Sequence, residues 1–103
     1  MDVVIHAAHA VDVSSSLRQY AEAKVRRLDR HFDRIIDARL DLDVAGKHSV
    51  DPPKVAELHV HVNGGVVQGK VTAHGLREAV DLVTDKVDEQ LRRRKERIKG
   101  HKR

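Results

Sequence analysis

Residues 55–74 read VAELHVHVNGGVVQGKVTAH, and the spacing of the apolar side chains in this stretch decides the fold. Apolar or small residues occupy alternate positions on both sides of the central NGG, at 56, 58, 60 and 62 and again at 67, 69, 71 and 73. Such alternation is typical of strands with one buried face. Asn63, Gly64 and Gly65 are residue types that adopt positive φ in tight turns. The stretch therefore predicts a β-hairpin with one apolar face.

The same period-two pattern predicts two further strands. In residues 2–8 (DVVIHAA) and 36–45 (IDARLDLDVA), apolar side chains alternate with mostly polar ones. Residues 46–54 (GKHSVDPPK) separate the second of these strands from the hairpin, and Pro52 and Pro53 cannot donate backbone hydrogen bonds. We expect this segment to be a loop.

Two other segments show the spacings of three and four residues that are typical of amphipathic helices. The first begins at Leu17, with a serine among residues 14–16 as its N-cap, and is expected to end near Asp33. The second spans roughly residues 76–99. Their apolar stripes comprise positions 17, 20, 21, 25, 28 and 32 in the first helix and 76, 79, 80, 83, 87, 91 and 98 in the second.

The predicted order of elements is therefore β-α-β-β-β-α, an α+β fold. Because each helix has one apolar stripe and each strand one apolar face, both helices should pack on one face of a four-stranded mixed sheet. The first two strands should be parallel, since a helix connects them. We expect a single domain over residues 1–99 and a basic tail at 100–103.

Composition excludes several classes of protein. With 103 residues the chain has room for one domain, and it contains no cysteine for disulfides, thiolate metal sites or a Cys nucleophile. The N-terminus lacks the pattern of a signal peptide, and apolar runs are too short to cross a membrane. A cytoplasmic protein fits best, without a membrane or small-molecule partner. Only 2% of residues are aromatic, which leaves few platforms for stacking bases.

Positive charge is concentrated on parts of the two predicted helices, although the net charge of the chain is only +4. From residue 92 to 103 there are eight Lys or Arg against a single acid, Glu96. This distribution of charge along the helices, the charge map, predicts contacts with a polyanion. RNA is favoured over a membrane surface because bulky apolar residues are scarce in this segment. We expect the cations to share one surface. They are Arg26, Arg27, Arg30, Arg92, Arg93, Arg94 and Arg97, with Lys86 in the same stripe as Arg93 and Arg97.

Histidines on the outer face of the predicted sheet were the candidates for a metal site. His59 and His61 lie two residues apart, and a neighbouring strand could add Asp41 or Glu57 as a third ligand. Solvated outward positions explain these histidines equally well, so no metal site and no cofactor are predicted. The serines before the first helix serve better as caps than as nucleophiles, and we expect no catalytic residue and no enzymatic activity.

Three segments resemble the ribosome hibernation-promoting factors, the family that includes ribosome-associated inhibitor A, also called protein Y. They are LRQYAEAKVRRLDRHFDRI (17–35), AELHVHVNGG (56–65) and AVDLVTDKVDEQLRRRKERIK (79–99), and the resemblance extends over nearly the whole chain. Arg77 departs from the pattern, because the family usually has an aromatic residue there. The loop at 46–54 is longer than in short members of the family.

The resemblance implies a fold similar to a double-stranded-RNA-binding domain and binding to the small ribosomal subunit through 16S rRNA. The protein would occupy the channel of mRNA and the A- and P-site tRNAs and inhibit translation without chemistry. A short member would act with a ribosome modulation factor to pair ribosomes; otherwise the chain is the N-terminal domain of a long member. Positions that match the family assign RNA contact to Arg18, Lys24, Lys86, Lys95 and Lys99. General binding of double-stranded RNA and metal binding by the sheet histidines remain as alternatives.

Overall fold

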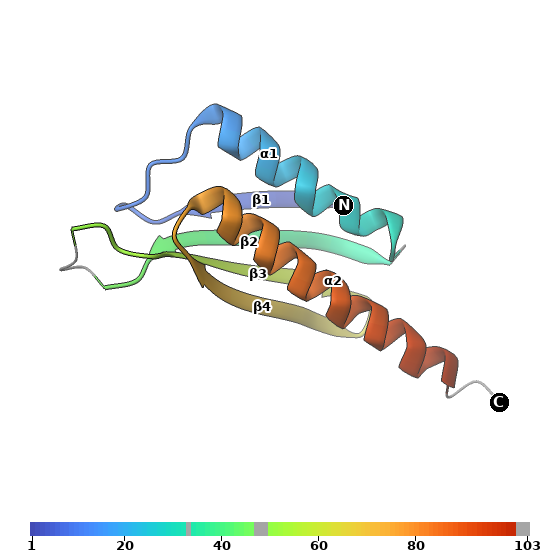
Figure 1. Ribbon diagram of the computed structural model, residues 1–103. Coiled ribbons are helices and arrows are strands. Elements are labelled where there is room, and N and C mark those ends of the chain that lie inside the picture. Colours follow the sequence, from blue (N-terminus) through green and yellow to red (C-terminus); the bar gives the residue numbers. More distant parts are fainter. Residues whose placement is uncertain (33, 47–49, 101–103) are drawn as a thin grey trace.

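The computed structural model describes residues 1–32, 34–46 and 50–100, with side chains described as far as residue 95. It contains the predicted order of elements, with the two helices lying across one face of the sheet (Figure 1). The strand boundaries differ from the predicted ones by at most one residue. The elements are β1 (Asp2–Ala7), α1 (Ser15–Arg26), a 3-10 turn η1 (Arg27–Arg30), β2 (Ile35–Val44), β3 (Lys54–Val62), β4 (Gly65–Ala73) and α2 (Leu76–Gly100).

The sheet has the strand order β1-β2-β3-β4. β1 runs parallel to β2, as expected from the helical connection, and the other neighbours are antiparallel. Asn63 and Gly64 form a two-residue turn between Val62 and Gly65, which confirms the hairpin. Within the described chain, Gly64 is the NGG residue with positive φ, at 92°, so a single left-handed position suffices for the turn.

The predicted serine N-cap of α1 is confirmed, because the Ser14 hydroxyl oxygen accepts a hydrogen bond of 3.1 Å from the backbone N–H of Leu17. The helix itself begins at Ser15, two residues before the predicted start. The predicted end near Asp33 was wrong: the α-helix ends at Arg26 and tightens into η1. After η1 the Leu28 carbonyl oxygen accepts hydrogen bonds from the His31 N–H at 3.1 Å, a 3-10 contact, and from the Phe32 N–H at 3.0 Å. The side chains of Leu28 and Phe32 are both buried before the chain enters β2. Neither described helix is long and apolar enough to cross a bilayer.

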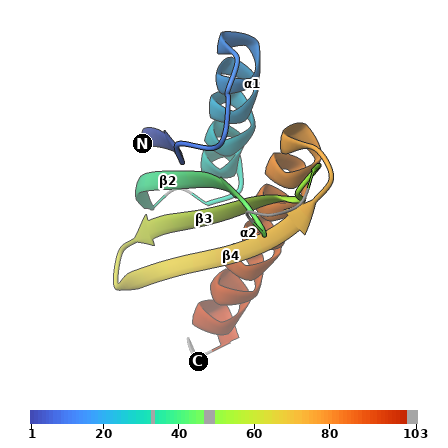
Figure 2. The ribbon, with the colours of Figure 1, turned by 90° about the vertical axis from the view of Figure 1, so that its left-hand side faces the viewer.

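One apolar core fills the space between the helices and the sheet, and Figure 2 shows both helices on the same side of that sheet. Most predicted inward-facing positions of β2, β3 and α2 are buried, including Leu40, Leu58 and Val83, each with no exposed surface. Val44 and Leu76 are only half-buried, and the side chain of Ile98 lies outside the described part of the chain. Gly69 lets α2 approach β4 closely, since a Cβ there would lie 3.1 Å from Val87 Cγ2. The opposite face of the sheet is open, and Val4 and Val66 are exposed on it.

Replacing Leu58, at the centre of this core, tests the packing. The substitution Leu58→Ala should lower the free energy of unfolding by about 2–5 kcal/mol, because it removes buried methyl groups and leaves a cavity. Urea denaturation followed by circular dichroism measures the change. Val4→Ala on the open face is the matched control and should cost far less; equal losses from both variants would contradict the burial pattern.

Candidate nucleic-acid interface

The two helices are tied together by polar contacts along their facing sides. The Tyr20 hydroxyl donates a hydrogen bond to Asp81 Oδ1, and the Arg77 guanidinium carbon lies 4.2 Å from the centroid of the Tyr20 ring. Lys24 Nζ reaches from α1 to within 3.9 Å of Asp81 Oδ1 and 3.6 Å of Asp85 Oδ1. Arg77 therefore contributes to the contact between the two helices. These contacts fix α1 and α2 relative to each other.

A groove of about 240 Å³ runs between the helices beside these contacts. Its lining combines cations with carboxylates: Lys24, Arg27, Leu28, His31, Thr84, Asp85, Asp88 and Arg92. Asp88 Oδ2 lies 2.9 Å from Arg92 Nη2, whereas Asp88 Oδ1 is buried without a hydrogen-bond partner among the described residues. The groove thus combines positive charge with carboxylates, one oxygen of which is buried.

Three of the predicted arginines form ion pairs with carboxylates one turn earlier in the same helix. These pairs are Arg26 with Glu22 at 3.0 Å, Arg92 with Asp88 at 2.9 Å and Arg93 with Glu89 at 2.7 Å. The side chains of Arg92 and Arg93 are 59% and 66% exposed, and exposed pairs of this kind contribute only about 0.2–1 kcal/mol each. A phosphate group can therefore replace the carboxylate at small cost.

The other predicted cations lie in different surroundings. Arg18 Nη1 donates to the carbonyl oxygen of Ile5 at 3.1 Å, and Lys86 Nζ donates to that of Lys70 at 3.2 Å. Between described residues, no ion pair to a carboxylate involves the exposed side chains of Arg27, Arg30, Lys86 or Lys95. The side chains of Arg97 and Lys99 lie outside the described part of the chain.

The cations occupy two sides of α2 rather than one continuous surface. Arg92 faces the groove shared with Lys24 and Arg27. Arg93 and Arg94 instead line a second groove of about 520 Å³ with residues 66–68 of β4 and Gln90. In that groove the Arg94 guanidinium packs on the hairpin, with Nη2 3.5 Å from the position a Cβ would take at Gly64 or Gly65. The cations that were expected to share one surface therefore lie on two sides of α2.

Sequence reasoning missed three residues of the groove between the helices: His31, Thr84 and Asp88. The Asp88–Arg92 spacing of four residues on a helix was a readable signal for a pair. His31 follows η1, and Thr84 is buried with its hydroxyl donating to the Val80 carbonyl oxygen at 2.7 Å. Only the packing of α1 against α2 brings these two residues together.

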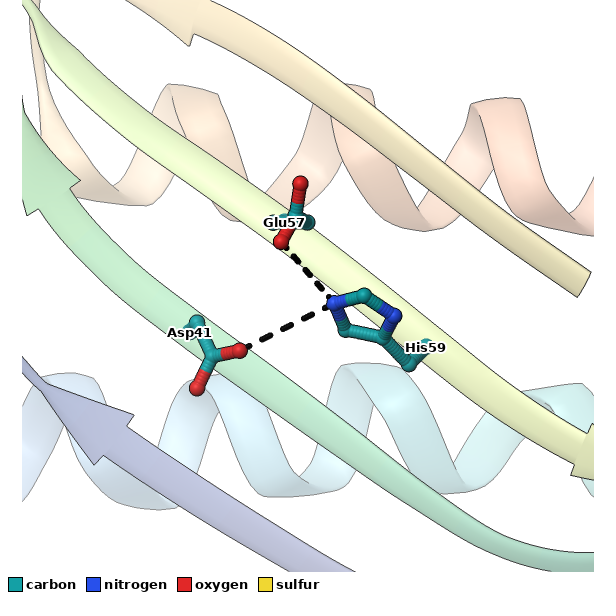
Figure 3. Close-up of side chains that lie close together, drawn as sticks. All are labelled: Asp41, Glu57 and His59. Carbon is teal, nitrogen blue, oxygen red and sulfur yellow. Dashed lines mark hydrogen bonds and ion pairs between the residues drawn. The ribbon is translucent and has the colours of Figure 1, made fainter.

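On the open face of the sheet, the two candidate histidines take different partners. His59 Nε2 lies 2.9 Å from Glu57 Oε1 and 3.8 Å from Asp41 Oδ2, as Figure 3 shows. His61 Nδ1 instead lies 3.0 Å from Asp37 Oδ1. The structure therefore does not join the two histidines in one cluster, but it does bring both of the suggested carboxylates to His59.

Comparison with known proteins agrees with this architecture. Residues 3–99 match the family described as sigma 54 modulation protein / S30EA ribosomal protein. A protein of Azotobacter vinelandii named ribosome hibernation promoting factor is 37% identical over 90 residues, which cover 86% of this chain and 78% of that protein. The chain therefore belongs to the S30EA family.

Longer proteins of the family and solved structures also match. The ribosome hibernation promotion factor of Deinococcus radiodurans is 33% identical over 87 residues, 84% of this chain but only 46% of that protein. The Thermus thermophilus Protein Y N-terminal domain superposes with a TM-score of 0.75 at 29% identity, covering 90% of this chain and 98% of that one. A ribosomal subunit interface protein from Coxiella burnetii, 23% identical with a TM-score of 0.78, shares the fold over 92% of this chain and 98% of its own.

The link between the helices predicts a dependence of stability on alkaline pH. The hydrogen bond to Asp81 and, secondly, partial burial raise the pKa of Tyr20 above its ordinary value of 10.0. Because the folded-state pKa is the higher one, this contribution to stability is fully present below pH 10.0 and is lost as the pH rises through the folded-state pKa.

Urea denaturation between pH 8 and pH 11 measures the effect. The free energy of unfolding should fall more steeply with pH in the unmodified protein than in Tyr20→Phe, which lacks the titrating hydroxyl. Tyr20→Phe should also lower stability at pH 8 by about 0.5–1.5 kcal/mol. Parallel pH profiles for the two proteins would show that the hydroxyl is not coupled to Asp81.

Proposed function

We propose that the protein binds the small ribosomal subunit and keeps the ribosome inactive by occupying the channel of mRNA and the A- and P-site tRNAs. The observation that carries this proposal is the family match across residues 3–99, with relatives named as ribosome hibernation promoting factors. Inhibition by occupancy needs no catalytic step and no cofactor. The protein would act in the cytoplasm, with 16S rRNA as the surface that it contacts.

Phosphate contacts from the helices would provide most of the affinity. Each helix carries exposed arginines, and a guanidinium group can bind a phosphate through two parallel hydrogen bonds. Arginines now paired with carboxylates on their own helix exchange one exposed ion pair for another when they bind RNA. The protein would then bind only where phosphates are dense enough to compensate for the lost ion pairs with these carboxylates. This requirement favours folded RNA over ligands with widely spaced negative charges.

The groove between the helices suits a ribose-phosphate backbone. Lys24, Arg27 and Arg92 can contact phosphate oxygens, while the carboxylate of Asp85, which is 70% exposed, can accept a hydrogen bond from a ribose 2′-hydroxyl. The 2′-hydroxyl is the group by which a protein distinguishes RNA from DNA at a given site. Tyr20 is engaged with Asp81 and Arg77, and Phe32 is only 9% exposed, so neither aromatic ring is available to stack on bases. Recognition would therefore depend on backbone and shape.

Reversing two charges of the groove tests this interface. Arg27→Glu combined with Arg92→Glu should reduce the affinity for small ribosomal subunits at least about tenfold, because each charge-assisted hydrogen bond contributes about 1.5–3 kcal/mol. Sedimentation with purified subunits through sucrose gradients at several protein concentrations measures the affinity. The matched control, Arg39→Glu with Lys70→Glu, makes the same change in net charge on the open face and should bind normally. An equal loss of affinity in both double variants would show that only the net charge matters and would contradict the proposed interface.

A competition experiment separates ribosome binding from general binding of double-stranded RNA. If the protein occupies the tRNA channel, tRNA bound to the small subunit should exclude it, and an unrelated RNA duplex should compete only in large excess. A general duplex binder would sediment with subunits regardless of tRNA. It would also bind any duplex with a log-log salt slope of about 0.9 per phosphate contact. Binding of any duplex, together with sedimentation that does not depend on tRNA, would contradict the proposed function and favour general binding of double-stranded RNA.

A further inference from the structure

We propose that the open face of the sheet carries a binding site for a divalent transition-metal ion, formed by Asp41, Glu57 and His59 (Figure 3). One ligand atom from each of these residues lies within 4.8 Å of the other two. Two ligand atoms that are each about 2.1 Å from a tetrahedral zinc ion lie about 3.4 Å apart. The distances from His59 Nε2 to Glu57 Oε1 and Asp41 Oδ2, 2.9 and 3.8 Å, bracket this value. Small side-chain rotations would therefore complete the site.

Strand pairing places the three residues together on a rigid surface. Asp41 in β2 is directly opposite Glu57 in β3, and His59 follows Glu57 by two residues and so shares its face. Both strands lie in the middle of the sheet, with Leu40 and Leu58 buried on the other side. The backbone under the cluster is thus fixed by the core, and the site does not depend on a loop.

Neighbouring side chains orient two of the ligands toward a common point. His59 Nδ1 lies 3.1 Å from Gln68 Oε1, so its N–H can donate to that oxygen, and the lone pair of Nε2 is then directed to the carboxylates. Arg39 Nε donates to Asp41 Oδ1 at 2.9 Å, which leaves Oδ2 directed into the cluster. This is the kind of outer contact that fixes the ligands of metal sites.

The close approach of these atoms requires either a hydrogen-bonding proton or a cation between them. A neutral His59 with its proton on Nδ1 would place a nitrogen lone pair 2.9 Å from a carboxylate oxygen, which is repulsive. Either a proton on Nε2 or a bound cation removes that repulsion. A divalent ion also neutralises both carboxylates, and a set of one imidazole and two carboxylates suits Zn²⁺ and similar ions. The three side chains are half-buried on the open face, so water can reach the remaining coordination positions.

Metal titration of the chelator-treated protein tests the proposal and does not depend on ribosome binding. Zn²⁺ measured by calorimetry should bind in a ratio of one per chain, and Co²⁺ should give an absorption spectrum of nitrogen and oxygen ligation. His59→Ala and Asp41→Asn should each weaken binding by about tenfold or more. His61→Ala, which removes the neighbouring histidine paired with Asp37, should leave the affinity unchanged. Circular dichroism confirms that each variant is folded.

Three results would overturn the site. If no binding is detected, a proton alone holds the cluster together. If His59→Ala binds Zn²⁺ as the unmodified protein does, the ion lies elsewhere. If His61→Ala weakens binding as much as His59→Ala, the ligands are the histidine pair two residues apart and not the cluster with Asp41 and Glu57.

Discussion

Both helices must cover the same face of the sheet, because only that face presents a continuous set of apolar side chains. Leu40, Leu58 and Val60 on the strands meet Val25 and Leu28 on the first helical segment and Val83 and Val87 on α2, all of them buried. Burying this much aliphatic surface is the main stabilising contribution in a domain with so few aromatic residues. The same constraint leaves the outer face of the sheet open, while the cations of α2 divide between the groove shared with α1 and the groove beside β4. Two chemically different surfaces follow from one hydrophobic layer.

Electrostatic interactions within the helices limit how much of the formal positive charge is available to a partner. Pairs such as Arg92 with Asp88 hold an arginine in a defined position while weakening the field that it projects. Because the pairs are exposed, they stabilise the fold only slightly. In the proposed binding to RNA, phosphates would have to be dense enough to displace the local carboxylates. The acids on α2 would then contribute to the specificity of the proposed interface as well as the bases.

Most of the fold could be predicted from the sequence because it depends on local periodicity. Alternating residues identified the strands, and the three-and-four spacing identified the buried faces of both helices. The end of α1 could not be read this way, since η1 forms only when Leu28 and Phe32 are drawn into the core before the chain enters β2. The groove between the helices depends on how α1 packs against α2, which no local pattern encodes. Likewise, Asp41 meets Glu57 only once the register of β2 and β3 is fixed. The prediction that the cations share one surface was also wrong for α2, because packing divides them between two grooves.

The polar contacts among Tyr20, Asp81 and Arg77 affect the affinity for a ligand as well as the shape of the protein. Because they lock the inclination of one helix against the other, the spacing between the cations on α1 and those on α2 is set before any ligand arrives. Little conformational entropy then remains to be lost on association. In the proposed binding to RNA, this fixed spacing would favour targets whose phosphates are already held at a matching separation over flexible strands that would have to be ordered first.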